Sequence, residues 1–322
     1  MLADVVVPSG HVGDHVSGFV IDELEVEEDH VHLLDPGGTG AGRPRYPTGR
    51  EREGEPPMVD DWGSAESYEP YVGRWSRAVA DEFLHWLAVP SGARWLEVGC
   101  GTGALTQAIC EEADPARLLA CDPSEAYLAY NRARTRDARA SFAVADATNL
   151  PSHPDRWDAV VSGLVLNFLP DPAAGIRSMA DRLRAGGLLG AYVWDYAARM
   201  ELMRFFWDTA VASDPRAEAL DEGRRFPLCQ PDALRALFEE ADLEAVETRA
   251  IDVPTAFRDF DDYWMPFLGG QGPAPGYVKS LDEDARERLR ERVRSALPTE
   301  PDGSIHLVAR AWAVRGRIPD GE

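Results

Sequence analysis

Lysine is almost missing from this chain, and basic residues are scarce as a whole. Lys279 is the only lysine among 322 residues, so mechanisms that use a lysine amine are largely excluded. The 33 basic side chains stand against 56 acidic ones, which leaves a formal charge of −23. Proteins that bind nucleic acid gain most of their affinity by neutralising phosphates with Arg and Lys. The charge therefore disfavours RNA or DNA as a partner and indicates a solvated acidic surface.

Long apolar runs and paired cysteines are missing as well. No apolar stretch approaches the roughly 20 residues that a membrane-spanning helix needs, and MLADVVVPSGHVGDH lacks the basic segment and apolar core of an export signal. We therefore expect a cytoplasmic protein without membrane insertion. The four cysteines, at positions 100, 110, 121 and 229, show no CxxC spacing, so we expect reduced thiols and no metal site.

The texture of the sequence divides the chain into a tail and one domain. Residues 1–57 are dense in Gly, Pro and charge without a sustained apolar period, which predicts a poorly ordered tail of unassigned role. Residues 58–322 are predicted to form the domain. Near its start, residues 71–86 repeat large apolar side chains at three- and four-residue steps, as one face of a helix does.

Residues 90–195 alternate between strand and helix patterns. Strands are predicted in ARWLEV, ARLLACD, ASFAVAD, RWDAVVSG and LLGAYVW, with helices between them. The helix before the fifth strand is predicted over 171–187, with Gly186 and Gly187 at its end. Such an alternation favours a parallel, doubly wound α/β sheet.

Beyond residue 194 the pattern loosens. Helices are predicted near 198–213, 231–241 and 281–297, and two alternating segments, 243–253 and 304–314, predict an antiparallel closing pair. We interpret 196–229 and 255–300 as helical cap insertions over the core. Six aromatic residues in them either line a ligand pocket or form plain core, and plain core is favoured; these are Tyr196, Phe206, Trp207, Tyr263, Trp264 and Phe267.

A glycine-rich segment, EVGCGTG, lies between the first strand and the following helix. Glycine lets the backbone approach a ligand and adopt positive φ. Asp122 ends the next strand about twenty residues on, where a carboxylate accepts both ribose hydroxyls of a nucleotide-like ligand; capping of the next helix is the alternative. Asp146 closes the third strand, where it would face the base of the same ligand beside the backbone N–H of Ala147. An ordinary loop carboxylate is the alternative for Asp146.

The segments LEVGCGTG, CDPS, VADATNLP, WDAVVSGLVLNFLPD and LRAGGLLGAYVW resemble, in order and spacing, the class I S-adenosylmethionine-dependent methyltransferases. They look most like the group with a type 11 methyltransferase domain, which includes the ubiquinone and menaquinone methyltransferases. The resemblance implies a Rossmann-like seven-stranded sheet of order 3-2-1-4-5-7-6 with the last strand antiparallel. It also implies S-adenosyl-L-methionine as cofactor, a small-molecule methyl acceptor, and a monomer or homodimer.

The resemblance assigns cofactor contacts to a set of positions in this sequence. The glycine loop would pass beneath the methionine part, with Glu97 supporting the loop or the amino group, and the residues after the fourth strand would border the methyl group. Tyr71 and Arg74 would close over the cofactor, although a packed helix face explains both equally well. The full set is Tyr71, Arg74, Glu97, Gly99, Cys100, Gly101, Gly103, Asp122, Pro123, Asp146, Ala147, Ser162, Gly163 and Leu164.

The acceptor side is less well defined. Methyl transfer from a sulfonium is an in-line displacement on an activated carbon, so the protein supplies mainly proximity, orientation and exclusion of water. Many relatives have His where this chain has Asn167, so a histidine base is excluded there. Asn167 is a candidate for orienting the acceptor and Asp195 for a general base, with a turn and a cap as the alternatives. The methylated atom, O, N or C, stays open.

Two other functions also stay open. The same cofactor motifs would occur in a protein that binds S-adenosylmethionine without catalysis. A nicotinamide-dependent dehydrogenase is less favoured, because its loop normally reads GxGxxG and this chain has no Tyr-x-x-x-Lys pair.

Overall fold

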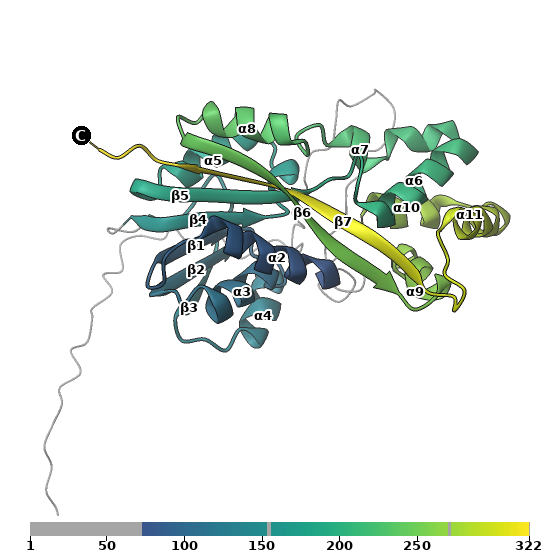
Figure 1. Ribbon diagram of the computed structural model, residues 1–322, viewed down its shortest axis with the longest axis horizontal. Helices are drawn as coiled ribbons and strands as arrows, with labels where there is room; N and C mark the ends of the chain where they lie inside the picture. The colour runs from purple at the N-terminus through teal and green to yellow at the C-terminus, as the bar shows by residue number, and fades with distance from the viewer. Residues whose placement is uncertain (1–72, 153–155, 270–271, 322) are drawn as a thin grey trace, which may run out of the picture. The chain divides into compact units, whose positions relative to one another are not determined.

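The computed structural model describes residues 73–152, 156–269 and 272–321, and its centre is a mixed seven-stranded sheet (Figure 1). The strand order is β3-β2-β1-β4-β5-β7-β6. β1 to β5 pair in parallel, whereas β7 runs antiparallel to both β5 and β6. The predicted order and antiparallel last strand are confirmed. The strands are β1 Arg94–Val98, β2 Arg117–Asp122, β3 Ala140–Val144, β4 Trp157–Gly163, β5 Leu183–Trp194, β6 Glu244–Phe257 and β7 Ile305–Arg317.

Helices cover both faces of the sheet, as expected of a doubly wound fold. On one face α2 packs against α3, and α4 packs on β2 and β3; on the other face α5 packs against α8. These helices are α2 Arg74–Leu87, α3 Ala104–Glu112, α4 Glu125–Arg134, α5 Pro172–Ala180 and α8 Pro231–Glu239. Ser124 and Asp171 begin α4 and α5 by accepting hydrogen bonds from backbone N–H groups of the first turn. The predicted tail, 1–57, lies outside the described residues.

The connection between α5 and β5 corrects the sequence prediction. The helix predicted over 171–187 ends at Ala180, and β5 begins at Leu183, so Gly186 and Gly187 lie inside a strand. Pairing with the end of β7 explains the difference: Gly186 donates its N–H to the carbonyl of Ile318, and the N–H of Ile318 donates to Gly187. Gly186 has a φ of +68° where the register between β4 and β5 shifts. The glycines serve a bulge rather than a helix end.

Two groups of helices lie beyond the carboxyl ends of the parallel strands (Figure 1). The group between β5 and α8 comprises α6 Glu201–Ser213, η3 Pro215–Ala219 and α7 Glu222–Arg225. The group between β6 and β7 comprises α9 Phe260–Trp264, η4 Met265–Leu268, α10 Pro273–Ser280 and α11 Glu283–Ala296. The predicted helices near 198–213, 231–241 and 281–297 are confirmed as α6, α8 and α11. No helix within the described ranges is long and apolar enough to cross a membrane.

The two groups share an aromatic core. The ring of Phe206 on α6 stacks on Phe267 of η4 with 4.5 Å between centroids, and the hydroxyl of Tyr263 on α9 donates to the carbonyl of Leu202 at 2.7 Å. Five of the six candidate aromatics are therefore plain core, as favoured from the sequence; these are Phe206, Trp207, Tyr263, Trp264 and Phe267. Tyr196 differs, because it lines the cavity described next.

Candidate active site

A cavity of about 400 Å³ opens at the carboxyl ends of the parallel strands. The point where the strand order reverses, between β1 and β4, lies at its centre. Open α/β sheets bind ligands in the crevice at this switch point. Ten predicted site residues line the cavity: Glu97, Gly99, Cys100, Gly101, Asp122, Pro123, Asp146, Ala147, Gly163 and Leu164.

The glycine loop after β1 has the backbone that the sequence predicts. Gly99, Gly101 and Gly103 have φ values of +76°, +49° and +95°, a region that side chains with a Cβ resist. A Cβ on Gly99 would lie 2.3 Å from Val165, and one on Gly103 would lie 2.2 Å from Asn131. A Cβ on Gly101 would meet nothing within 4 Å. Gly101 thus borders open space, while Gly99 and Gly103 let neighbouring segments approach.

Asp122 is held rigidly at the end of β2. Its Oδ2 accepts the backbone N–H of Gly101 at 2.9 Å, and its Oδ1 accepts that of Ser124 at 2.8 Å. Burial raises the pKa of Asp122, and these two backbone donors oppose the rise. Each carboxylate oxygen can accept more than one hydrogen bond, so both remain able to bind a pair of hydroxyls.

Glu97 lies at the end of β1 in a buried polar chain. The hydroxyl of Thr106 donates to Oε2 of Glu97 at 2.6 Å, the amide of Asn131 donates to that hydroxyl at 2.8 Å, and the hydroxyl of Thr135 donates to Oδ1 of Asn131. Burial raises the pKa of Glu97 to about 8, although the Thr106 hydrogen bond lowers it; the nearby Asp122 charge adds to the rise. The carboxyl is therefore poised to ionise when a cation comes close.

Asp146 and Ala147 follow β3 on the same edge of the sheet. Oδ1 of Asp146 accepts the backbone N–H groups of Thr148 and Asn149 and the hydroxyl of Thr148. The Thr148 hydroxyl is the main reason why the pKa of Asp146 lies below its usual range. Asp146 is exposed, whereas Ala147 is buried beside it. The pair forms one wall of the cavity.

The end of β4 supplies the opposite wall. Gly163 and Leu164 line the cavity, and Leu164 has a φ of +62°. A Cβ on Gly163 would lie 2.5 Å from the hydroxyl of Tyr192, so glycine allows this close approach. Ser162 does not line the cavity; its buried hydroxyl donates to the carbonyl of Val98 at 2.8 Å and ties β4 to β1.

Among the described residues, Arg74, Gly103 and Asn167 do not line the cavity. Arg74 forms an ion pair with Asp262 at 3.2 Å and stacks on Trp75 and Phe257. Gly103 is the N-cap of α3, behind the loop. Asn167 lies in η2 (Leu166–Phe168), and Tyr71 lies outside the described residues. Their roles at the site stay predictions.

Three aromatic residues at the end of β5 line the cavity, and two of them were missed from the sequence. Tyr192, Trp194 and Tyr196 all contribute to the lining. Side chains alternate between the two faces of a strand, so Tyr192 and Trp194 share a face of β5, and Tyr196 follows in the turn after it. This two-residue period was the available signal. Asp195 accepts the N–H of Ala198 at 3.2 Å, and burial raises its pKa; its role as a base stays a prediction.

The remaining lining residues come from several elements. Ser76 belongs to α2 and Tyr127 to α4, while others follow the glycine loop, β3 and β4. Seven of them lie within the segments that carry the resemblance, namely Val98, Thr102, Thr148, Val165, Phe168, Leu169 and Pro170, although no role was assigned to them individually. The others reach the cavity through tertiary packing. The full set is Ser76, Val98, Thr102, Ala104, Leu105, Tyr127, Thr148, Val165, Phe168, Leu169 and Pro170.

Fold and cavity define a doubly wound α/β protein with a cavity at the carboxyl edge of the sheet, where such folds bind their ligands. A family model described as a methyltransferase domain matches residues 96–187. Trans-aconitate 2-methyltransferase of Streptomyces avermitilis is 28% identical over 273 residues, which cover 80% of this chain and 98% of that protein. Malonyl-[acyl-carrier protein] O-methyltransferase of Acetivibrio thermocellus is 26% identical over 51% of this chain and 57% of that protein.

A solved structure, the YcgJ protein of Bacillus subtilis, aligns with a TM-score of 0.50 at 15% identity, covering 77% of this chain and all of that chain. It supports the fold. Residues 96–187 match a methyltransferase domain and the relatives are named as methyltransferases, so the protein is a methyltransferase enzyme with S-adenosylmethionine as cofactor. The resemblance stated from the sequence is confirmed.

Proposed function

We propose that this enzyme moves a methyl group from S-adenosylmethionine to a small-molecule acceptor by in-line displacement. One observation carries the proposal: the Asp122 carboxylate is fixed by the glycine loop itself, through the N–H of Gly101, at the edge of the cavity. A carboxylate so held is preorganised for two vicinal hydroxyls. The open space in front of Gly101 leaves room for a ligand to lie against the loop.

The residues of the cavity fit the cofactor part by part. We place the methionine part against Gly99, Cys100 and Gly101, with Glu97 near the amino group. Asp122 and Pro123 would hold the ribose. Asp146 and Ala147 would hold the adenine, and Gly163 and Leu164 would border the methyl group. Ser162 and Gly103 would support these contacts from behind through the backbone that they hold.

When bound, S-adenosylmethionine supplies a methyl group on a sulfonium, already activated for displacement. The protein then has to bind, orient and keep water away. The buried walls formed by Leu105, Tyr192 and Trp194 suit the exclusion of water.

The acceptor end of the cavity favours an uncharged molecule with an apolar face. Phe168, Trp194 and Tyr196 line this part, and aromatic side chains offer flat apolar contact. The charged side chains that line the cavity among the described residues are three carboxylates, Glu97, Asp122 and Asp146. No Arg, Lys or His of the described residues lines the cavity, so a polycarboxylate acceptor would find no side chain to balance its charge. We therefore propose phenols and hydroquinones ahead of an anion of the kind named for the trans-aconitate enzyme.

We also propose that residues 58–322 form one catalytic domain, with a cofactor core at 90–195 and caps at 196–229 and 255–300. The position of the inserted helices beyond the carboxyl ends of the strands supports this division (Figure 1). Action in the cytoplasm, a monomer or homodimer, and the absence of a nucleic-acid partner stay predictions.

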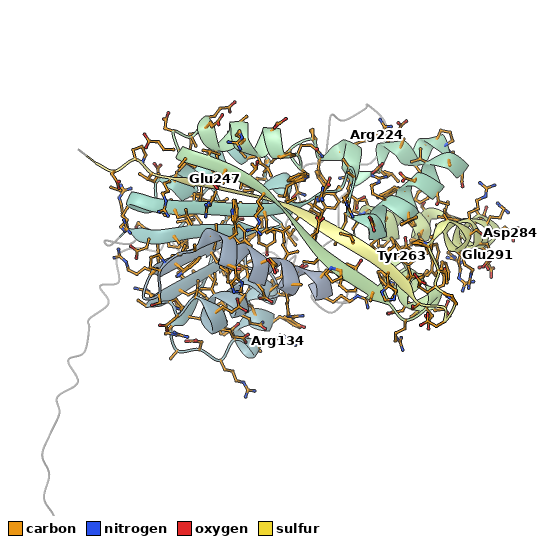
Figure 2. All side chains as sticks on the ribbon, viewed as in Figure 1. Arg134, Arg224, Glu247, Tyr263, Asp284 and Glu291 are labelled. Carbon is orange, nitrogen blue, oxygen red and sulfur yellow. The ribbon has the colours of Figure 1, made fainter. Side chains whose placement is uncertain are left out.

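Calorimetric titration with S-adenosylmethionine tests the proposal. Asp122→Ala should weaken binding about 100-fold or more, because two hydrogen bonds to a charged group are lost at roughly 1.5–3 kcal/mol each. Asp284→Ala is the matched control, since Asp284 is an exposed carboxylate on α11 (Figure 2). It should leave the affinity unchanged. Absence of binding by the folded wild-type protein, or equal affinity in the Asp122 variant, would contradict the proposed site.

A further inference from the structure

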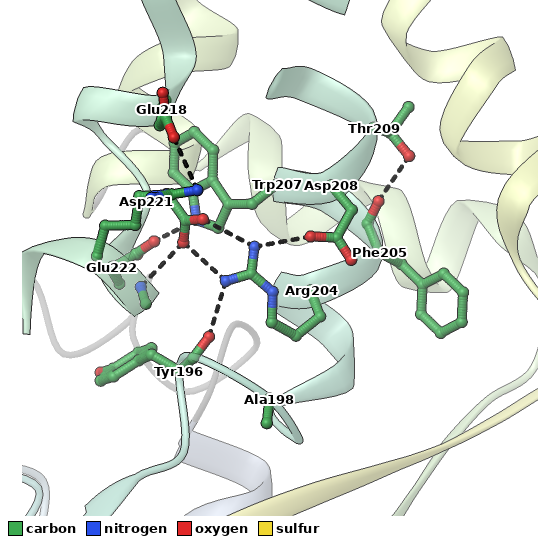
Figure 3. A network of polar contacts seen from close by, with 12 residues as sticks. Tyr196, Ala198, Arg204, Phe205, Trp207, Asp208, Thr209, Glu218, Asp221 and Glu222 are labelled. Carbon is green, nitrogen blue, oxygen red and sulfur yellow. Dashed lines mark hydrogen bonds and ion pairs between the residues drawn. The ribbon is translucent and has the colours of Figure 1, made fainter. Parts of the chain in front are cut away.

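The backbone of Tyr196 is held by a side chain from an inserted helix. Nη1 of Arg204, on α6, donates to the carbonyl oxygen of Tyr196 at 2.9 Å (Figure 3). Tyr196 follows β5 closely and lines the cavity, in the part proposed above to take the acceptor. The contact therefore joins the cap to the wall of the active site.

Arg204 is itself fixed by a buried ion pair. Its Nη1 and Nη2 donate to the two oxygens of Asp221 at 2.8 and 2.9 Å, a bidentate arrangement visible in Figure 3. The side chains of Arg204 and Asp221 are 11% and 7% exposed. A third bond goes to Asp208, which is mostly exposed. A planar guanidinium held in this way has one orientation, and that orientation directs Nη1 at Tyr196.

The segment after Asp221 also packs tightly against Tyr196. Gly223 donates its N–H to Oδ1 of Asp221 at 2.9 Å, and a Cβ on Gly223 would lie 2.8 Å from the carbonyl oxygen of Tyr196. Phe226 follows α7 and places its ring 5.5 Å from that of Tyr196 and 5.3 Å from that of Phe168. The ring of Phe226 thus stands behind two rings of the cavity wall.

We propose that Arg204 and Asp221 are positioning residues that set Tyr196 at the acceptor end of the cavity and so determine acceptor affinity. The inference rests on the proposed function for the meaning of that end of the cavity. The ion pair fixes the carbonyl of Tyr196, and Phe226 fixes its ring. Loss of the bidentate pair releases the carbonyl and lets the ring shift, while the cofactor walls after β1, β2 and β3 keep their own contacts.

Fluorine NMR on protein labelled with 3-fluorotyrosine reads the position of Tyr196 without any acceptor. The chain has nine tyrosines, and Tyr196→Phe assigns the resonance. Arg204→Lys should shift or broaden that resonance, because lysine keeps the positive charge but lacks the planar guanidinium that forms the bidentate pair with Asp221. Arg224→Lys is the control, since Arg224 pairs with Glu218 in an exposed ion pair. An unmoved Tyr196 resonance in folded Arg204→Lys protein would overturn the proposal.

A double-mutant cycle then reads the effect on acceptor affinity. The probe is 1-naphthol, titrated into protein saturated with S-adenosylhomocysteine. Arg204→Lys should weaken its binding about tenfold, within the range of couplings inside one network, and Tyr196→Ala should remove this difference. Asp221→Asn should act as Arg204→Lys does, with S-adenosylhomocysteine affinity within about twofold of the wild type in each.

The outcomes separate this inference from the proposed function. If the wild-type protein binds no S-adenosylhomocysteine, the proposed function fails. The fluorotyrosine spectra of wild type and Arg204→Lys still show whether Arg204 positions Tyr196. If cofactor binding is normal but 1-naphthol binds equally to wild type and Arg204→Lys, or to neither, the role in acceptor affinity is overturned. An equal effect of Arg204→Lys with and without Tyr196 would also overturn it.

Discussion

Glu97 should make cofactor affinity depend on pH, and Glu97→Gln should remove the dependence. In the free protein burial raises the pKa of Glu97 to about 8, so the carboxyl is mostly protonated at neutral pH. The positive amino group proposed beside it favours the ionised form. Binding should therefore release close to one proton, and only the ionised fraction of the protein binds tightly.

The magnitude follows from the ionised fraction. Below a pKa of about 8 this fraction falls tenfold for each pH unit, so the affinity should rise about 100-fold between pH 5.5 and 7.5. This window lies below the range near 7.7–8.0 where an α-amino group loses its own proton. Glutamine keeps an oxygen for the Thr106 hydroxyl and cannot ionise. The Glu97→Gln variant should therefore bind S-adenosylmethionine more weakly than the wild type at pH 7.5, and its affinity should not change between pH 5.5 and 7.5.

Calorimetry in buffers of different ionisation enthalpy measures both the affinity and the protons released. The Gln variant is the control, since every other titrating group, including those of the cofactor, is the same in both proteins. A flat affinity in the wild type, or the same slope in Glu97→Gln, would refute the placement of a cation beside Glu97.

The same residue should act on stability in the opposite direction. The folded state holds a proton that the unfolded chain releases above a pKa of about 4.5, so the free energy of unfolding should fall as pH rises from about 5 to 8. Each pH unit in this window corresponds to about 1.4 kcal/mol at most. Urea unfolding without cofactor should show a smaller slope in Glu97→Gln than in the wild type. Equal slopes would show that Glu97 ionises freely in the folded protein.

Two further substitutions test the framework of the site. Gly103→Ala should lower the free energy of unfolding by about 1–3 kcal/mol more than Gly303→Ala, as measured by urea unfolding. Both glycines have φ near +90°, but only a Cβ at position 103 would strike Asn131. Equal losses of stability would mean that the backbone angle alone explains the effect. Asp158 bridges Arg94 and Arg184, and these hydrogen bonds outweigh desolvation and lower its pKa to about 2. The free energy of unfolding of Asp158→Ala should therefore lie about 1–2 kcal/mol below that of the wild type above pH 4, and this difference should shrink as pH falls towards 2. Cofactor affinity should be unchanged. A difference in stability that stays constant with pH would contradict the lowered pKa.

Features that depend on short stretches of chain could be predicted from the sequence. The positive φ values of the glycine loop are a property of glycine itself, and the alternation of periods two and 3.6 marks strands and helices. Asp122 could be placed because the end of a strand and the spacing from the loop define its position. The alternation of Tyr192 and Trp194 within β5 was equally local.

Contacts between distant segments were decided only by the tertiary structure. Arg74 pairs with Asp262, 188 residues away, rather than lining the cavity. Gly186 enters a strand because the end of β7 pairs with it, although its local sequence favours a helix end. These contacts depend on which surfaces meet after the sheet closes, and no periodicity carries that information. The sequence alone therefore determined the elements, the loop and the carboxylate at the sheet edge, whereas packing decided which side chains complete the cavity and which ion pairs hold its walls.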